Sequence, residues 1–144
     1  MSLLDCQVAV LANQAQNYLV SGRDPQRMGN AHPNIVPYQV FAVKDGHLII
    51  AVGNDSQFAK LCGVLGRSEL AQDPAYATNK ARVAARIELA PILSGEIEKY
   101  ARDDLLSRLE AVGVPAGPIN SVSDVFADPQ VIHRGMKVDL PATG

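Results

Sequence analysis

YQVFAVKDGHLIIAV, residues 38–52, is the stretch that decides the fold of this chain of 144 residues. Two runs of β-branched and aromatic residues flank Lys44-Asp45-Gly46, and an Asp-Gly pair in this setting is a strong hairpin signal. The pattern predicts strands at about 38–43 and 47–52. Because a hairpin excludes a purely parallel sheet, we predict an α+β fold, a small mixed sheet that contains this hairpin and is packed with several helices.

Before the hairpin, apolar residues recur at helical spacing from residue 3 to residue 19, and Ser2 is a suitable N-cap. The apolar face of this helix is broad and needs a partner. The segment from Gly22 to Pro37 is rich in proline and glycine and is expected to be a loop.

After the hairpin, capping residues and apolar stripes predict further helices, and two more strands are expected at 114–119 and 136–140. Pro91 should end, kink or restart the helix that Thr78-Asn79 begins, in which Ile87 is expected to face inward. A helix is expected after the capping segment Gly53–Ser56, and the chain is expected to be helical again at Ile92–Tyr100. The other helices are expected to begin at Asp103, Ser123-Asp124 and Asp128-Pro129.

The composition restricts the class of protein. The chain is 47% hydrophobic with a formal net charge of −2, which argues against disorder and against a nucleic-acid or anionic-membrane surface. No apolar run approaches the roughly 18 residues of a membrane span. Cys6 and Cys62 form no CxxC pair, and each falls on an apolar helix face, as buried cysteines do. We expect a soluble, cytoplasmic protein that binds neither nucleic acid nor membrane.

Familiar catalytic and metal-binding motifs do not occur in the sequence. His32, His47 and His133 lie far apart, and neither cysteine lies near a histidine at metal-ligand spacing. We therefore expect no metal site and no tightly bound cofactor.

The loop Gly29-Asn30-Ala31-His32-Pro33 is the segment whose residues best suit binding or catalysis. A glycine beside small and polar residues exposes backbone N–H groups that can donate to an acyl oxygen or an oxyanion, and His32 can donate or accept a proton. The alternative is an ordinary linker in which the asparagine and histidine side chains stabilise turns.

Charged groups elsewhere also have two interpretations. The segment Gly53–Gln57 suits an anion at a helix N-terminus, but Asp55 would repel a phosphate, which favours simple capping. Asp103-Asp104 is expected to favour a helix dipole rather than to form a catalytic pair. The helix face of Lys80, Arg82 and Arg86 could meet a phosphate, but it is more typical of a solvated face.

Separated signatures over residues 2–136 occur together in one known family. They are Gly29–Phe41 with Asp45-Gly46, Ile50–Phe58, Asp73–Asn79 with Arg82-Val83, Gly113–Asn120, and Asp128–Val131 with Arg134–Met136. This set resembles the family III CoA-transferases, which include formyl-CoA and carnitine CoA-transferases and the α-methylacyl-CoA racemases.

The resemblance implies that the chain is a small-domain fragment of a longer enzyme. Members of the family have a Rossmann-like large domain, built from both ends of the chain, with a small domain inserted, and they form interlocked homodimers. By this comparison residues 1–21 are a helix of the large domain, 22–36 a linker, 37–127 the small domain and 128–144 the start of the return linker.

The resemblance also implies a chemistry, the transfer of CoA between an acyl-CoA and a carboxylic acid through an aspartyl intermediate. The nucleophilic aspartate of the family lies upstream of this chain, and Asp5 does not match its motif. No catalytic residue is therefore expected here, and the fragment alone is expected to be inactive. Gly29, Asn30, Ala31, His32 and Pro33 match a loop that covers the acyl intermediate in some members, although residues 30–32 depart from its glycine-rich form.

Two alternatives remain open. The parent could be an α-methylacyl-CoA racemase or epimerase, which uses an acid and a base to move a proton instead of forming an acyl-aspartate. The chain could also be a stand-alone interaction module whose first helix, at residues 3–19, docks on a partner.

Overall fold

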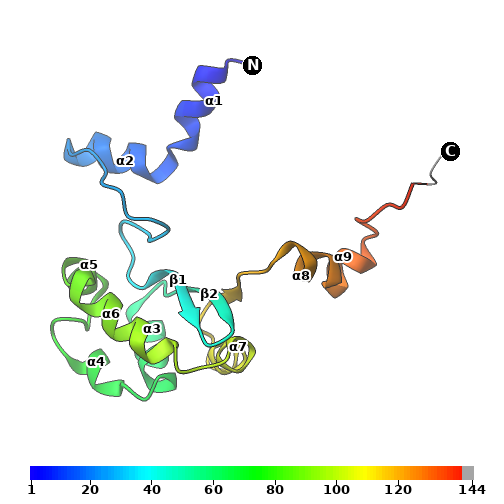
Figure 1. The fold of residues 1–144 in the computed structure, drawn as a ribbon. Coiled ribbons are helices and arrows are strands. Elements are labelled where there is room, and N and C mark those ends of the chain that lie inside the picture. The colour runs from blue at the N-terminus through cyan, green and yellow to red at the C-terminus, as the bar shows by residue number, and fades with distance from the viewer. Residues whose placement is uncertain (141–144) are drawn as a thin grey trace.

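The computed structural model describes residues 1–140, and Figure 1 shows a central body with an arm at each end. The body contains a sheet of strands β1 (Tyr38–Val43), β2 (Gly46–Ala51) and β3 (Ala116–Pro118) in that order, with helices packed against it. The predicted α+β class is confirmed.

The hairpin forms as predicted. β1 and β2 pair antiparallel in a register that sets Phe41 against Leu48, and Lys44-Asp45 make the turn between them. The turn is tied to the body because the Arg102 backbone N–H donates to Asp45 Oδ1 over 2.7 Å. Phe41, Leu48 and Ile50 are buried, which places one face of the hairpin in the core.

β3 is shorter than the predicted strand at 114–119. It pairs antiparallel with β2, with Gly117 opposite Ile49. All strand pairs within residues 1–140 are therefore antiparallel, which corrects the prediction of a mixed sheet. Pro115 and Pro118 have no N–H to give to a sheet ladder, which restricts the segment to the edge position that it occupies. The strand expected at 136–140 is wrong, because these residues lie on the C-terminal arm, away from the sheet edges (Figure 1).

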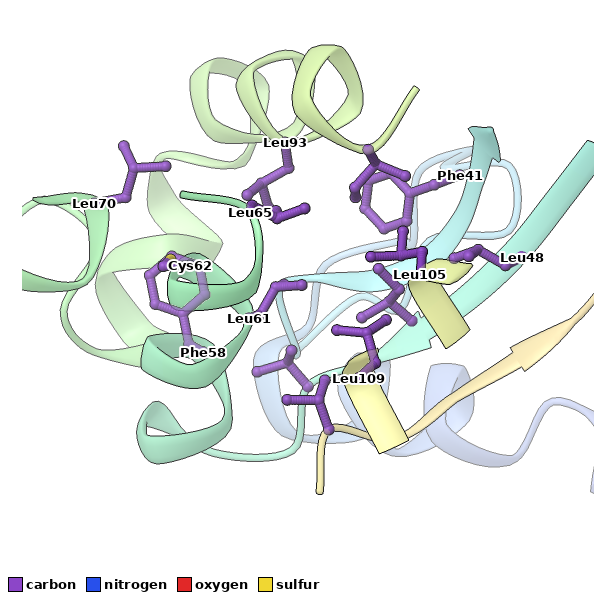
Figure 2. Close-up of a cluster of buried hydrophobic side chains, with 14 of the residues drawn as sticks. Phe41, Leu48, Phe58, Leu61, Cys62, Leu65, Leu70, Leu93, Leu105 and Leu109 are labelled. Carbon is purple, nitrogen blue, oxygen red and sulfur yellow. The ribbon is translucent and has the colours of Figure 1, made fainter. Parts of the chain in front are cut away.

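Three helices supply most of the core that covers the sheet. These are α3 (Asp55–Val64), α6 (Arg86–Ile97) and α7 (Arg102–Ala111). In Figure 2 the labelled leucines of these helices lie in one cluster with Phe41 and Leu48 of the hairpin. The fully buried helix residues are Leu61, Cys62, Leu89, Leu93, Ile97, Leu105 and Leu109. α4 (Ser68–Gln72) and α5 (Asn79–Ala84) complete the body.

The helical segment after Thr78 breaks at Ala85 and not at Pro91. Pro91 lies inside α6, whereas Ala85 separates α5 from α6. Arg82, Leu89 and Leu93 form the buried side of the two helices, while Ile87, which was expected to face inward, is 86% exposed. The predicted orientation of Ile87 is therefore wrong.

The N-terminal arm is two helices where one was predicted. α1 (Leu3–Val10) and α2 (Ala12–Ser21) are separated at Leu11, and Ala12 has a φ of +43°. Both helices project from the body (Figure 1), and neither contains a buried residue. Cys6 is accordingly exposed, which corrects the expectation that it is buried.

The C-terminal arm carries α8 (Val122–Ala127) and α9 (Pro129–His133). Ser121 and Asp124 form a reciprocal capping box at the start of α8, so this helix is capped at Ser121 and not at the predicted Ser123-Asp124. Asp128 caps α9, as predicted. Within residues 1–140, no helix combines the length and apolar character needed to cross a bilayer.

The two cysteines should differ in reactivity. Burial raises the pKa of the Cys62 thiol to about 11, and the thiolate is the reactive form. We expect iodoacetamide at about pH 8 to label Cys6 in the folded chain and to spare Cys62, whereas both are labelled after unfolding. Mass spectrometry of the labelled peptides measures this, and equal labelling of both cysteines in the folded chain would contradict the buried position of Cys62.

The same pKa shift affects stability at high pH. The pKa of the Cys62 thiol in the folded chain lies above the ordinary value of 9.0, so the folded chain favours the neutral thiol. The resulting contribution to the free energy of unfolding is fully present below about pH 9. This contribution is lost as the pH rises toward 11.

Candidate functional site

Residues 32–36, which lead into the hairpin, are fastened to the body by one face of α5 and α6. Asn79, Arg82 and Arg86 are spaced so that they lie on the same side of the two consecutive helices. Their side chains donate hydrogen bonds to the backbone carbonyls of this segment, which are those of His32, Pro33, Asn34 and Val36. A short stretch of linker is thereby held from one side.

Arg82 is the central residue of this attachment. Its guanidinium is fully buried and donates to Val36 O over 2.7 Å, to Tyr76 O over 2.9 Å and to Asp55 Oδ1 over 2.9 Å. It also lies over the Phe58 ring, with Cζ 4.4 Å from the ring centroid. The expectation that Arg82 lies on a solvated face is therefore wrong, because these acceptors replace water around its charge.

The start of α3 is occupied by the protein itself. The Asn54 side chain accepts from the Gln57 backbone N–H over 2.9 Å, and Gln57 Oε1 accepts from the Gly53 N–H over 2.7 Å. Asp55 is held by Arg82 and also accepts from the Asn79 backbone N–H over 2.8 Å. The capping interpretation of Gly53–Gln57 is confirmed.

Asn79 has a role that the sequence analysis missed. Its Oδ1 accepts from the Val36 N–H over 3.2 Å, and its Nδ2 donates to Asn34 O over 2.8 Å. Thr78 caps α5, as predicted, by accepting from the Ala81 N–H. The signal for Asn79 was its spacing from Arg82 and Arg86, which marks a common helix face but does not say what that face contacts.

The loop Gly29–Pro33 is ordered by its own backbone and by β1. Gly29 has a φ of +62°, which a residue without Cβ adopts readily. The Ala31 N–H donates to Met28 O over 3.2 Å, and the His32 N–H donates to Tyr38 O over 2.9 Å. The His32 and Tyr38 rings stack with centroids 5.2 Å apart. The loop therefore has a defined position against the hairpin.

The internal hydrogen bonds of this loop use the acceptor atoms of its polar side chains. Asn30 Oδ1 accepts from the Val40 N–H over 3.0 Å, and His32 Nδ1 accepts from the Asn34 N–H over 3.1 Å. A neutral His32 must then carry its proton on Nε2. Asn30 Nδ2 and His32 Nε2–H remain available as donors to a ligand. The arrangement suits a carbonyl oxygen, a carboxylate or an oxyanion.

The other charged candidates are separated from this loop's chemistry. Lys80 is exposed, and Asp103 and Asp104 are exposed in the first turn of α7, as predicted. Asp104 pairs with Arg108 on the same helix over 3.0 Å. Among residues 1–140, no three histidine, cysteine, aspartate or glutamate side chains gather as a metal site would require.

Comparison with known proteins places these features in a family. The sequence model described as CoA-transferase family III matches residues 1–144. The chain is 59% identical over 142 residues to the succinate–glutarate CoA-transferase of Agrobacterium fabrum, covering 99% of this chain and 36% of that protein. It is 44% identical over 145 residues to the human succinyl-CoA:glutarate CoA-transferase, covering 99% of this chain and 33% of that protein.

A solved structure shares the fold. The crystal structure of a CaiB/BaiF family protein from Brucella suis superimposes with a TM-score of 0.82 and 60% sequence identity, over 96% of this chain and 37% of that chain. The chain thus spans about a third of the length of the proteins that it matches.

Replacing Arg82 tests the attachment of the linker. We expect Arg82→Met to lower the free energy of unfolding by about 3 kcal/mol or more, because it leaves the Val36 and Tyr76 carbonyls without this donor and removes the ion pair of Asp55. The matched control is Arg108→Met, which removes an exposed pair on α7 and should cost less than about 1 kcal/mol. Urea denaturation of the chain measures both, and equal effects would show that the Arg82 contacts add no stability.

Proposed function

Because the chain belongs to CoA-transferase family III, we propose that it is part of an enzyme that transfers CoA between an acyl-CoA and a carboxylic acid. The match of the family model to residues 1–144 of this chain is the observation that carries the proposal. The relatives whose names specify succinate, succinyl-CoA and glutarate favour dicarboxylic acids and their CoA thioesters as the substrates. CoA is then a substrate and not a resident cofactor.

The reactive carboxylate in this proposal comes from outside residues 1–144. An aspartate attacks the carbonyl carbon of the thioester, the C–S bond breaks, and CoA leaves as a thiolate, so that the acyl group and the aspartate remain joined as a mixed anhydride. The thiolate then attacks the aspartyl carbonyl, which releases the first acid and leaves an aspartyl-CoA thioester. The same two steps in reverse, with the acceptor acid, give the new acyl-CoA. Asp5, exposed on α1, has no part in this scheme.

The contribution of this chain is the loop Gly29–Pro33, which we place beside the acyl group. Each attack produces a tetrahedral intermediate with negative charge on oxygen. Asn30 Nδ2 and His32 Nε2–H are donors of the kind that stabilises such charge, and their acceptor atoms are already engaged by the protein. The contacts of the linker with Asn79, Arg82 and Arg86 hold these donors in position before substrate binds.

The arms have a role in the same proposal. Residues 1–21 pack on a large domain, 22–36 link it to a small domain at 37–127, and residues 128–144 lead back. The exposed apolar side chains of α1 and α2, among them Leu4, Val8 and Leu19, support this division because they require a covering surface. The whole enzyme is a homodimer in this view.

Turnover by the whole enzyme tests the reaction. We expect CoA to pass from succinyl-CoA to glutarate, and we expect the 144-residue chain alone to give no turnover, since it brings no acyl-accepting aspartate. A parallel incubation of a chiral 2-methylacyl-CoA in D2O checks the racemase alternative. Deuterium incorporation without CoA transfer would replace the transferase by a racemase, and turnover by the isolated chain would contradict its role as a part.

The role of His32 is tested in the whole enzyme by two substitutions. We expect His32→Ala to lower kcat about a hundredfold, as the loss of one oxyanion donor does elsewhere. His32→Gln keeps an N–H donor and should recover part of this loss. His47→Ala, an exposed position on β2, is the control and should leave kcat unchanged. An unchanged kcat/KM in His32→Ala would return Gly29–Pro33 to the role of a plain linker.

A further inference from the structure

Arg86, the first residue of α6, lies directly under the loop Gly29–Pro33. Its Nη2 donates to His32 O over 3.1 Å and to Pro33 O over 2.7 Å. The side chain is partly buried, and burial lowers its pKa from the ordinary value without removing its charge at neutral pH. A single nitrogen of the guanidinium therefore holds the loop, while Nη1 and Nε remain as donors.

The charge of Arg86 is not balanced by the protein described here. Within residues 1–140, the other arginines that are not exposed, Arg67, Arg82 and Arg102, each form a salt bridge with an aspartate or a glutamate, whereas the exposed Arg23, Arg27 and Arg134 form none. No ion pair in the same residues includes Arg86, and its two contacts are with neutral carbonyls. Carbonyl dipoles solvate a cation but leave its net charge in place, so an unneutralised positive charge lies beside the loop.

This charge adds to a loop whose polar side chains already present donors. Asn30 Oδ1 and His32 Nδ1 each accept a hydrogen bond inside the protein, and Asn30 Nδ2 and His32 Nε2–H remain available as donors. Donors together with a cation favour an anion over a neutral polar group. The acid substrate of a CoA transfer is such an anion, and a dicarboxylic acid keeps one carboxylate free while the other is joined to CoA.

We propose that Arg86 is a specificity-determining residue that binds the free, non-reacting carboxylate of a dicarboxylic acid substrate. The inference rests on the proposed CoA transfer and adds the residue that distinguishes a dicarboxylic from a monocarboxylic acid. In the bound state the carboxylate supplies the negative charge that Arg86 lacks, and the hydrogen bonds to His32 O and Pro33 O keep the guanidinium in place. A monocarboxylic acid of the same length gains nothing from Arg86 once it is joined to CoA.

The test is a comparison of two acceptor acids of equal length, glutarate and pentanoate, with the whole enzyme. We expect Arg86→Gln to raise the KM for glutarate roughly tenfold to hundredfold, because it removes a charge-assisted contact. The KM for pentanoate should change less than about twofold. Arg86→Lys keeps the charge and should lie between the wild type and Arg86→Gln for glutarate. Arg108→Gln removes an equal charge from α7 and should behave as the wild type.

A purely structural role gives a different result. If Arg86 only fixed the loop, Arg86→Gln would lower kcat for both acids equally and leave the ratio of their KM values unchanged, which would overturn the proposal. Arg86→Lys provides the same comparison if Arg86→Gln does not fold, and an unaltered KM ratio there would also overturn it.

Calorimetric binding of glutarate and pentanoate separates this proposal from the proposed reaction. Suppose that the wild-type enzyme transfers no CoA but binds glutarate more tightly than pentanoate, and that Arg86→Lys or Arg86→Gln loses this preference. This result would disprove the proposed transfer and support the Arg86 site. Equal binding of the two acids by the wild type would overturn the Arg86 site, whatever the reaction.

Discussion

The buried guanidinium of Arg82 constrains the arrangement of the linker, the hairpin and the helices. Taking a cation out of water costs several kcal/mol, and this cost is offset only while every acceptor around it stays in place. Those acceptors come from separate segments: Val36 from the linker, Tyr76 from the turn before α5, and Asp55 from the start of α3. Moving any one of them exposes an uncompensated charge, so the three segments keep one relative position.

This constraint also determines the chemical character of the loop Gly29–Pro33. The linker carbonyls turn toward α5 and α6, where Arg82, Asn79 and Arg86 donate to them. The acceptors of Asn30 and His32 are taken up by neighbouring N–H groups. Asn30 Nδ2 and His32 Nε2–H remain available as donors, and Arg86, which forms no ion pair within residues 1–140, contacts the same loop through the His32 and Pro33 carbonyls. The polarity of the loop thus follows from how the linker is attached to the body.

Local chemistry made the hairpin predictable, and distant contacts made the site unpredictable. The Asp45-Gly46 signal needs only neighbouring residues to act, and the hairpin formed where it was predicted. Arg82 was assigned to a solvated face because periodicity identifies a common helix face but not its tertiary partners, and its partner Asp55 lies 27 residues away in sequence. The false strand at 136–140 had suitable residues but no neighbouring strand to pair with.

The loop Gly29–Pro33 is held by the body and not by the exposed N-terminal arm. Burying one leucine-sized side chain is worth about 1.5–3 kcal/mol, so the apolar residues of α1 and α2 favour packing against a surface outside this body. Such packing could displace the loop only through the links between arm and linker. Within residues 1–140, the side-chain hydrogen bonds across this junction are two amide bonds between Asn17 and Asn34, of 2.9 and 3.5 Å, and the bond that Ser21 Oγ accepts from the Arg23 N–H over 3.2 Å. The attachment to α5 and α6 includes charged donors and a buried arginine, and is therefore the stronger. The loop consequently follows the body, and the arm is free to adopt the packing that its apolar surface requires.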